Sequence, residues 1–523
     1  MNDSGGFRSP VVIARRMVLV VSAVLLATAC GGGKSPGATA SLPIDPTSIQ
    51  SSGSTPGAIQ INVSPALTPN FDPSIHDYVV NCASNPEVQF TAQGPNANIT
   101  LYSTGGAINR PLPYPVSYLH RTFPLAPGQG FRFVMSGETS NYSVRCLPSD
   151  FPPLSVAVNG TRQAQYYLFA PTLAFNLPAS VKPSSYVIIT DANGTPVWWK
   201  SELLGEALDA KILGSNEIAW TNQTNQPIGQ YVIRNFAGER INTIGSDLND
   251  HDLQPTQSGT FLAIRDVQRI CPPDCADMSP WGGSAQTGAL DQEIVEIDQQ
   301  SNVLWRWRTR DHIALVESGA AGFFPGVGTD IIHMNAVEPD GADGVLFSAR
   351  HLSAIYRVIK STGAIDWKVG GTPRGESLTV IGDIRPTTMG ANGIALSGQH
   401  DVRRWSDGTV SVHDNGTVAN RPPSIVRYQI DTGARTAQVV EQLQDTIDAA
   451  SVCCGSARRL PGGHWLVQWG GIPYMSEIDS SGNSVFTVNY NIGGQFSYRA
   501  FPILPGIVSA DVLRGGMDVM SVN

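Results

Sequence analysis

Two short motifs alternate along most of the chain, and they restrict its fold more than any other feature. The first motif is an apolar run that enters an Asp or Asn turn and continues as a second apolar run, as in Ile188–Trp199. The second motif is a glycine turn that leads into an apolar strand. Each motif occurs six times beyond about residue 155, and each glycine turn follows one copy of the first motif. The turn glycines are Gly214, Gly259, Gly344, Gly408, Gly463 and Gly516.

Two hairpin signals in every repeat predict about four strands per repeat, which is typical of the blades of a β-propeller. The 53 Gly and 37 Pro residues and a charged fraction of 15% also favour short strands and tight turns over helices. We therefore predict an all-β chain with a six-bladed β-propeller over residues 155–523. The last expected strand is Leu513–Val519, so one blade should combine both chain ends and close the ring.

The N-terminus has the features of an export signal. Arginines precede an apolar run from Met17 to Ala27, which is too short to span a membrane and typical of a secretory signal peptide over residues 1–30. Small residues leading into Cys30 resemble a lipoprotein processing site, and cleavage after Ala29 without lipidation is the alternative. We expect an exported protein of the cell envelope, in the periplasm or at the cell surface, anchored to the membrane by a lipid on Cys30.

Two regions separate the signal from the repeats. Residues 31–56 consist mainly of Gly, Ser, Thr and Pro, which predicts a flexible linker. Short alternating apolar runs with turn residues between them then predict a small N-terminal β-sandwich over residues 57–150.

Export favours disulfide bonds among the remaining cysteines. Cys82 and Cys146 bracket the predicted sandwich and are expected to pair with each other. Cys271 and Cys275 could close a small loop. Cys453 and Cys454 could form a vicinal disulfide or cross-pair with the first two cysteines, and the sequence leaves this choice open.

Three histidines occupy nearly the same place in consecutive repeats. His251, His333 and His400 lie 8, 11 and 8 residues before the glycine of the next turn. Because the first strand of each blade lines the central channel, the three rings are expected to point towards the axis. Arg265 and Arg350 both lie six residues after their turn glycine, where an ion pair between blades is the alternative role.

Imidazoles beside a guanidinium suit an anion with several oxygens, such as sulfate or phosphate. Three histidines can also hold zinc, but a nearby guanidinium would not help such a site. We therefore predict no metal.

Several spaced motifs then carry a resemblance to a known family. His333-Met-Asn335, Ser348-Ala-Arg350-His351, Gln399-His400 and Val412-His-Asp414-Asn415-Gly416 resemble the motifs of the arylsulfotransferases, the bacterial aryl-sulfate sulfotransferases that do not use the nucleotide donor PAPS. The likeness covers most of residues 155–523 and implies a six-bladed propeller. It also implies that His400 is transiently sulfated, while His251, His333 and Arg350 bind the sulfuryl oxygens and assist the leaving phenol. Asn335, Asn415 and Arg265 are expected to contact the substrate.

The leading hypothesis is a sulfotransferase that moves a sulfuryl group from an aryl sulfate to a phenolic acceptor through a sulfohistidine, without a cofactor. Its partners would be these small molecules, because a net charge of -9 argues against nucleic acid. One alternative is a non-catalytic propeller that binds a ligand or a partner protein at the cell surface. Another is an aryl sulfate hydrolase, which would share the first half-reaction and use water as acceptor.

Overall fold

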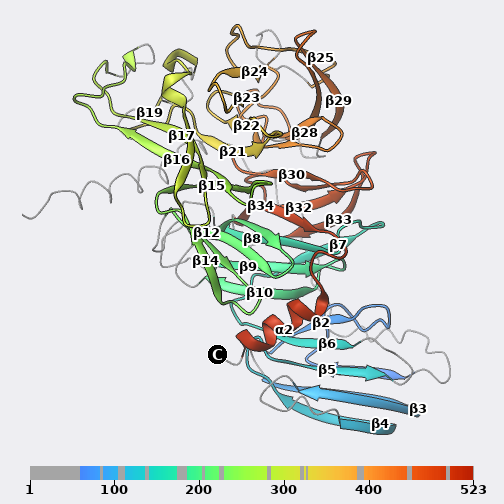
Figure 1. Ribbon diagram of the computed structural model, residues 1–523. Coiled ribbons are helices and arrows are strands. Elements are labelled where there is room, and N and C mark those ends of the chain that lie inside the picture. Colours follow the sequence, from blue (N-terminus) through green and yellow to red (C-terminus); the bar gives the residue numbers. More distant parts are fainter. Residues whose placement is uncertain are drawn as a thin grey trace, which may run out of the picture.

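The computed structural model is built almost entirely from strands (Figure 1). It describes residues 59–82, 86–103, 112–135, 141–173, 185–202, 207–222, 229–279, 284–317, 323–324, 328–385, 394–444, 450–490 and 495–521. The expected signal peptide, Cys30 and the linker of residues 31–56 lie outside these residues.

Most strands belong to six antiparallel sheets of four strands in the described part of the chain, two of which gain a fifth strand. From the innermost strand outward, the first sheet contains β34 (Gln495–Ile503), β8 (Tyr166–Leu173), β9 (Ser185–Asp191) and β10 (Pro196–Glu202). The second contains β11 (Ala207–Gly214), β12 (Glu217–Asn222), β13 (Tyr231–Arg234) and β14 (Arg240–Ile244). The third contains β15 (Leu248–Pro255), β16 (Phe261–Arg269), β17 (Ala289–Ile297) and β18 (Val303–Arg308). The fourth sheet contains β21 (Met334–Pro339), β22 (Gly344–Ala349), β23 (Ala354–Ile359) and β24 (Ile365–Gly370). The fifth contains β26 (His400–Arg404), β27 (Val410–Asp414), β28 (Ser424–Asp431), β29 (Thr436–Gln444) and β25 (Thr379–Ile381). The sixth contains β30 (Ser456–Arg459), β31 (Trp465–Gln468), β32 (Tyr474–Ile478), β33 (Ser484–Asn489) and β7 (Ser155–Val158). A small pair, β19 (Phe323–Phe324) and β20 (Gly328–Thr329), and a 3-10 turn, η3 (Thr309–Asp311), lie on the connections.

The innermost strands form a closed ring. Contacts run from β11 to β15, β21, β26, β30 and β34 in turn, and β34 again contacts β11. Sheets that face neighbours on both sides bury both faces of their strands, so β9 and β22 are buried at every residue. The predicted all-β propeller is confirmed by this arrangement.

In several copies of the first repeated motif an aspartate hydrogen-bonds the backbone of its own turn. Asp191 Oδ1 accepts the N–H groups of Asn193 and Thr195 at 2.9 and 2.8 Å. In the last sheet, Asp479 Oδ1 likewise accepts the backbone N–H groups of the residues two and four positions later. The turn glycine takes a positive φ, +81° at Gly194, which side chains rarely adopt.

The ring closes through a different segment from the one predicted. One sheet does combine both chain ends, since β34 pairs with β8. However, Leu513–Val519 is not a strand, because residues Ala510–Met520 form the helix α2. Gly516 therefore lies within a helix and is not a sixth hairpin turn. The closing strand is β34, which lies before it in the sequence.

The N-terminal strands form one bent sheet rather than two separate sheets. Its long strand β3 pairs with β1 through its first half and with β5 through its second half. The ring of Phe90 lies 5.5 Å from that of Phe131 and 5.1 Å from that of Phe133, although its own backbone neighbours are in β1 and β4. The two halves thus fold face to face around one apolar core. The strands are β1 (Gln60–Ser64), β2 (Asp77–Asn81), β3 (Glu87–Ser103), β4 (Leu112–Pro124), β5 (Gly130–Met135) and β6 (Tyr142–Leu147).

Helix α2 joins this sheet to the propeller, between β10 and the blue N-terminal strands in Figure 1. Leu513 and Met517 are buried in the propeller core. On the side of the N-terminal sheet, Arg514 Nε donates to Asp77 Oδ1 at 2.8 Å, and Asp518 accepts from Arg145 at 2.7 Å. The helix is therefore amphipathic. Its apolar residues pack in the propeller, and its charged residues pair with the N-terminal sheet.

Buried charges cross-link the innermost strands around the axis. Asp252 Oδ1 accepts from Lys211 Nζ at 2.9 Å and from Arg499 Nη1 at 2.8 Å. Its Oδ2 accepts from Arg403 Nη2 at 2.9 Å. Asp252 is fully buried, and these partners come from β11, β26 and β34. The same network contains Asp209, Glu338, Asp401 and Arg458.

Two of the expected disulfide bonds are present and one pair of cysteines is not bonded. Cys82 pairs with Cys146, and Cys271 pairs with Cys275. Cys453 and Cys454 are buried free thiols, so neither the vicinal bridge nor a cross-pairing is formed. No helix among the described residues has the length and apolar character needed to cross a membrane.

Candidate active site

The three histidines lie on the innermost strands of three consecutive sheets. His251 belongs to β15, His333 immediately precedes β21, and His400 is the first residue of β26. The strand pairing is irregular next to each histidine, for example between His400 and Arg403. Such bulges turn side chains away from the regular strand direction.

His400 is fixed in one protonation state by its hydrogen bonds. Nδ1 donates to Asn415 Oδ1 at 2.8 Å and to the carbonyl of Gly398 at 3.1 Å, so this nitrogen carries the proton. Nε2 accepts the N–H of Cys454 at 3.1 Å. Burial, and then the charge of Arg350, hold the pKa of His400 well below its usual range. The ring is therefore a neutral imidazole with its lone pair on Nε2.

Asn415 orients His400 rather than meeting a substrate. It is fully buried, and its Nδ2 donates to Ser451 Oγ at 3.1 Å and to the carbonyl of Cys454 at 3.0 Å. Because these bonds fix the amide, Oδ1 faces His400. The expectation of a substrate contact by Asn415 does not fit this geometry.

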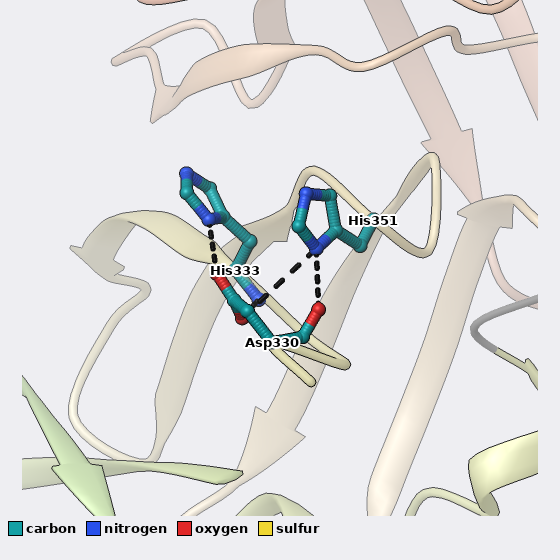
Figure 2. Close-up of side chains that lie close together, drawn as sticks. All are labelled: Asp330, His333 and His351. Carbon is teal, nitrogen blue, oxygen red and sulfur yellow. Dashed lines mark hydrogen bonds and ion pairs between the residues drawn. The ribbon is translucent and has the colours of Figure 1, made fainter. Parts of the chain in front are cut away.

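His333 is held by Asp330, as Figure 2 shows. The Asp330 carboxylate accepts the His333 backbone N–H at 3.0 Å through one oxygen and bonds Nδ1 through the other. His333 also has a positive φ of +52°, which brings its ring over Asp330. Nδ1 faces the carboxylate in Figure 2, so Nε2 is directed away from it. Burial lowers the pKa of His333.

His251 meets His333 edge to face, with ring centres 5.0 Å apart. Its Nδ1 lies 2.5 Å from Asn249 Oδ1 and 3.1 Å from Asp250 Oδ1. Burial opposes protonation, but the hydrogen bond and the charge of Asp250 outweigh it and raise the pKa of His251. Two touching imidazoles with pKa values moved in opposite directions are suited to act as acid and base.

Arg350 lies beside these rings with only neutral partners. Nη1 donates to His351 Nε2 at 2.9 Å, and Nη2 donates to the carbonyl of Val452 at 2.8 Å. Its buried Nε has no hydrogen-bond partner in the described part of the chain, where no carboxylate pairs with this side chain either. Its two acceptors among the described residues are therefore uncharged.

The two other predicted substrate contacts differ from each other. Arg265 is bound by Asp247 at 3.0 Å and by Glu293 at 3.2 Å. These ion pairs lie within its own sheet rather than between blades, because Glu293 is on β17 and Asp247 directly precedes β15. Asn335 is fully buried, and its Nδ2 donates to the carbonyl of Gln399 at 2.8 Å. Its Oδ1 has no partner among the described residues. Asn335 therefore keeps one polar atom that a ligand could use.

Several residues near the histidines were not singled out as site residues from the sequence. The ring of Tyr498 lies 5.5 Å from that of His251, and it clusters with Phe496 and the thiols of Cys453 and Cys454. Burial raises the pKa of Tyr498 and of Cys454. Asp330 could have been predicted from the sequence, because it stands only three residues before His333. Tyr498 could not, because it lies far away in the sequence on the closing strand.

Asp330, His333 and His351 also meet the spacing of a metal site, with one ligand atom of each within 4.8 Å of the others. Both rings use Nδ1 to bond Asp330, and the Nε2 of His351 accepts from Arg350. A cation there would have to break these bonds beside a guanidinium, so the cluster fits a hydrogen-bonded unit better than a metal site.

Together these observations define a β-propeller in which three consecutive sheets supply His251, His333 and His400, and Arg350 directly follows β22. Arg350 has no carboxylate partner in the described part of the chain. A family model described as "Arylsulfotransferase (ASST)" matches residues 212–491. This is more than half of the 523 residues, and the chain belongs to the arylsulfotransferase family. No curated protein matches the chain.

Among solved structures the chain is similar to propellers at low identity. A protein of unknown function from Bacteroides caccae is 12% identical over 65% of this chain and 99% of that chain, with a TM-score of 0.39. Streptogramin B lyase is 8% identical over 65% of this chain and 88% of that chain, with a TM-score of 0.33. The Dos1 propeller is 9% identical over 67% and 91%, with a TM-score of 0.31. These similarities carry no argument about function.

Proposed function

We propose that this chain transfers a sulfuryl group from an aryl sulfate ester to a phenol, with Nε2 of His400 as the nucleophile. One observation supports this most strongly. The ring of His400 is neutral, and its proton is held on Nδ1 by Asn415 and Gly398. The guanidinium of Arg350, which has no carboxylate partner among the residues that the structure describes, lies nearby. A nucleophile needs the free lone pair, and the sulfuryl oxygens need the charge.

In the first half-reaction the lone pair of Nε2 attacks sulfur, an N–S bond forms and the bond from sulfur to the aryl oxygen breaks. The departing phenolate takes a proton from His251, whose raised pKa favours the protonated ring. The sulfated imidazole becomes cationic, and the acceptors Asn415 Oδ1 and Gly398 O stabilise its Nδ1–H. Arg350 offsets charge on the sulfuryl oxygens.

The second half-reaction reverses these roles. A phenol enters, His251 or His333 removes its proton, and the phenolate oxygen attacks sulfur while the N–S bond breaks. In the resting structure the N–H of Cys454 occupies the lone pair of His400 Nε2, so substrate binding has to displace this hydrogen bond. Catalytic contacts commonly rearrange in this way when a substrate binds.

The experiment uses the purified protein and a chromogenic aryl sulfate, with and without a second phenol, in a chelator and without any nucleotide. Release of the first phenol should depend on the acceptor, because the sulfated histidine has to be discharged. His400→Ala should abolish release and the labelling of the protein by ³⁵S-aryl sulfate. Release without an acceptor would favour hydrolysis. An inactive protein over a range of aryl esters would favour a binding module.

We also propose export to an oxidising compartment and lipid anchoring through Cys30. The two disulfide bonds, Cys82–Cys146 and Cys271–Cys275, support the first part. In cells, the full chain should sediment with membranes, and Cys30→Ala should release it into the soluble fraction. An unchanged membrane fraction for Cys30→Ala would contradict lipidation.

A further inference from the structure

We propose that His351 is a positioning residue for Arg350. Its uncharged ring accepts a hydrogen bond from the guanidinium, so the arginine is held in place and keeps its full charge for the sulfuryl group. This inference rests on the proposed function. The sequence alone assigns no separate role to His351. Its contacts in the structure give it one.

Hydrogen bonds fix the tautomer of His351. Nδ1 donates to the carbonyl oxygen of Asp330 at 2.6 Å, so the proton is on Nδ1 and the lone pair is on Nε2. That lone pair accepts from Arg350 Nη1 at 2.9 Å. The other acceptor of the guanidinium, the carbonyl of Val452 at 2.8 Å, is also uncharged. Both partners therefore orient the guanidinium without cancelling its charge.

The backbone holds the two residues in place. The N–H of Arg350 donates to the carbonyl of His333 at 3.0 Å, and the N–H of His351 donates to the carbonyl of Ile332 at 3.2 Å. Both acceptors belong to the segment before β21 that also contains Asp330. Arg350, His351, His333 and Asp330 thus form one hydrogen-bonded unit, in which a shift of one member would displace the others.

The surroundings keep His351 uncharged. Three charged or titratable groups contact it among the described residues: Asp330, with Oδ1 3.9 Å from Nδ1, His333, with its ring centre 4.7 Å away, and Arg350. Burial lowers the pKa of His351 to about 3, Asp330 opposes this change, and His333 and Arg350 reinforce it. At neutral pH the ring is an acceptor and carries no charge.

In the neighbouring sheet an arginine is held by charged partners instead. Arg265 stands at the equivalent position, six residues after its turn glycine, and it is held by two carboxylates, Asp247 and Glu293. Carboxylates hold a guanidinium firmly but neutralise it. A guanidinium has five N–H donors, and Arg350 gives one to His351 and one to Val452. Its remaining donors, including the buried Nε–H without a partner among the described residues, suit a tetrahedral anion with several oxygens.

Three substitutions of His351 separate position from charge. His351→Gln keeps an uncharged acceptor, His351→Leu removes the acceptor, and His351→Glu replaces it with a carboxylate. Calorimetry with inorganic sulfate reports anion binding independently of sulfuryl transfer, and kcat and KM for a chromogenic aryl sulfate are measured on the same proteins. Urea unfolding of each variant shows whether the fold is kept.

His351→Gln should bind sulfate within a few-fold of the unsubstituted protein. His351→Leu should bind it about tenfold more weakly, because the guanidinium loses one of its two fixed partners. His351→Glu should lose sulfate binding as fully as Arg350→Gln, yet unfold at the same or higher urea concentration, because the new ion pair holds the arginine and cancels its charge. A role in stability alone would move the unfolding midpoint and leave sulfate affinity unchanged.

Sulfate affinity in His351→Glu equal to that of the unsubstituted protein would overturn the inference, whatever the activity. An Arg350→Gln variant that binds sulfate normally would instead contradict the role of Arg350 in the proposed function. Loss of sulfate binding in Arg350→Gln together with normal binding in all three His351 variants would leave the proposed function standing and remove His351 from it.

Discussion

Arg350 and Arg265 lie six residues after the turn glycine in consecutive sheets, but within the part of the chain that the structure describes, carboxylates bind only Arg265. Arg350 donates instead to the ring of His351 and to a backbone carbonyl. The same residue type at the same place in the repeat therefore has two different roles. One guanidinium holds a sheet together, and the other keeps its charge beside three histidines.

Exchanging each arginine for alanine should separate these roles. Arg350→Ala should slow release of the first phenol by roughly 10²–10³-fold, the usual effect of removing one charge-stabilising group, with little change in the urea midpoint. Arg265→Ala should leave the rate within a few-fold and lower the unfolding free energy by about 1–3 kcal/mol, because it removes a partner of the buried Glu293. A large rate loss in Arg265→Ala would restore it to the substrate site.

Asn415 should control the protonation state of His400. Asn415→Leu removes the stronger of the two acceptors of Nδ1, so the ring can turn and kcat should fall by roughly 10²-fold. Asn415→Asp keeps an acceptor but adds a negative charge, which raises the pKa of His400 and should move the acidic limb of the pH–rate profile to higher pH. Equal kcat values for Asn415→Leu and the unsubstituted protein would show that Gly398 alone is sufficient.

Acid should destabilise the protein through its buried neutral histidines. His413 is fully buried, neither ring nitrogen has a hydrogen-bond partner among the described residues, and burial lowers its pKa to about 4. Because the unfolded chain binds this proton near pH 6.5, the contribution is complete above that pH and is lost as pH falls towards 4. The loss is about 1.4 kcal/mol per pH unit for each such histidine.

His413→Leu should therefore reduce the dependence of the unfolding free energy on pH between 6.5 and 4.5. Urea unfolding at several pH values measures this, and His120→Leu, at an exposed ring of the N-terminal sheet, is the matched control. If His413→Leu has the same pH dependence as the unsubstituted protein, the ring is already protonated or paired in solution.

Adjacent glycines in α2 offer a test of how the helix docks. A Cβ on Gly516 would lie 2.1 Å from the carbonyl oxygen of Phe236, which also accepts Trp198 Nε1–H at 2.8 Å. A Cβ on Gly515 would have no heavy atom within 4 Å. Gly516→Ala should therefore destabilise the protein by about 1–3 kcal/mol, whereas Gly515→Ala should stabilise it by about 0.5–1 kcal/mol through helix propensity. Thermal unfolding compares the two, and equal effects would mean that α2 is undocked in solution.

The repeat pattern was sufficient to predict the propeller and the register of the three histidines, because each depends on local periodicity. Closure was predicted at the wrong segment. The run around Gly516 has the glycine and apolar residues of a hairpin, but its apolar residues Leu513 and Met517 are four apart and face one side of a helix. The closing strand β34 carries no turn glycine of the repeated kind.

The parts of the site that were missed depend on contacts between distant segments. Nothing local distinguishes Arg265 from Arg350, because the deciding carboxylates lie on other segments: Asp247 directly before β15, and Glu293 on β17. Asn415 was expected to contact substrate, whereas its bonds to His400 Nδ1 and to the carbonyl of Cys454 show that it orients the ring of His400. Adjacent cysteines likewise gave no sign that Cys453 and Cys454 stay as thiols beside His400.

The position of Arg499 on β34 has a consequence for biosynthesis. This strand leaves the ribosome after all the others of the ring, and its guanidinium reaches both Asp209 and Asp252 at the centre. Without β34, four carboxylates at the centre retain three cationic partners among the described residues: Asp209, Asp252, Glu338 and Asp401 pair with Lys211, Arg403 and Arg458. An uncompensated buried charge costs several kcal/mol, so a partial ring opens to water. The ring is therefore expected to close only when β34 joins β8 and completes the sheet of β9 and β10, which brings Arg499 to the axis.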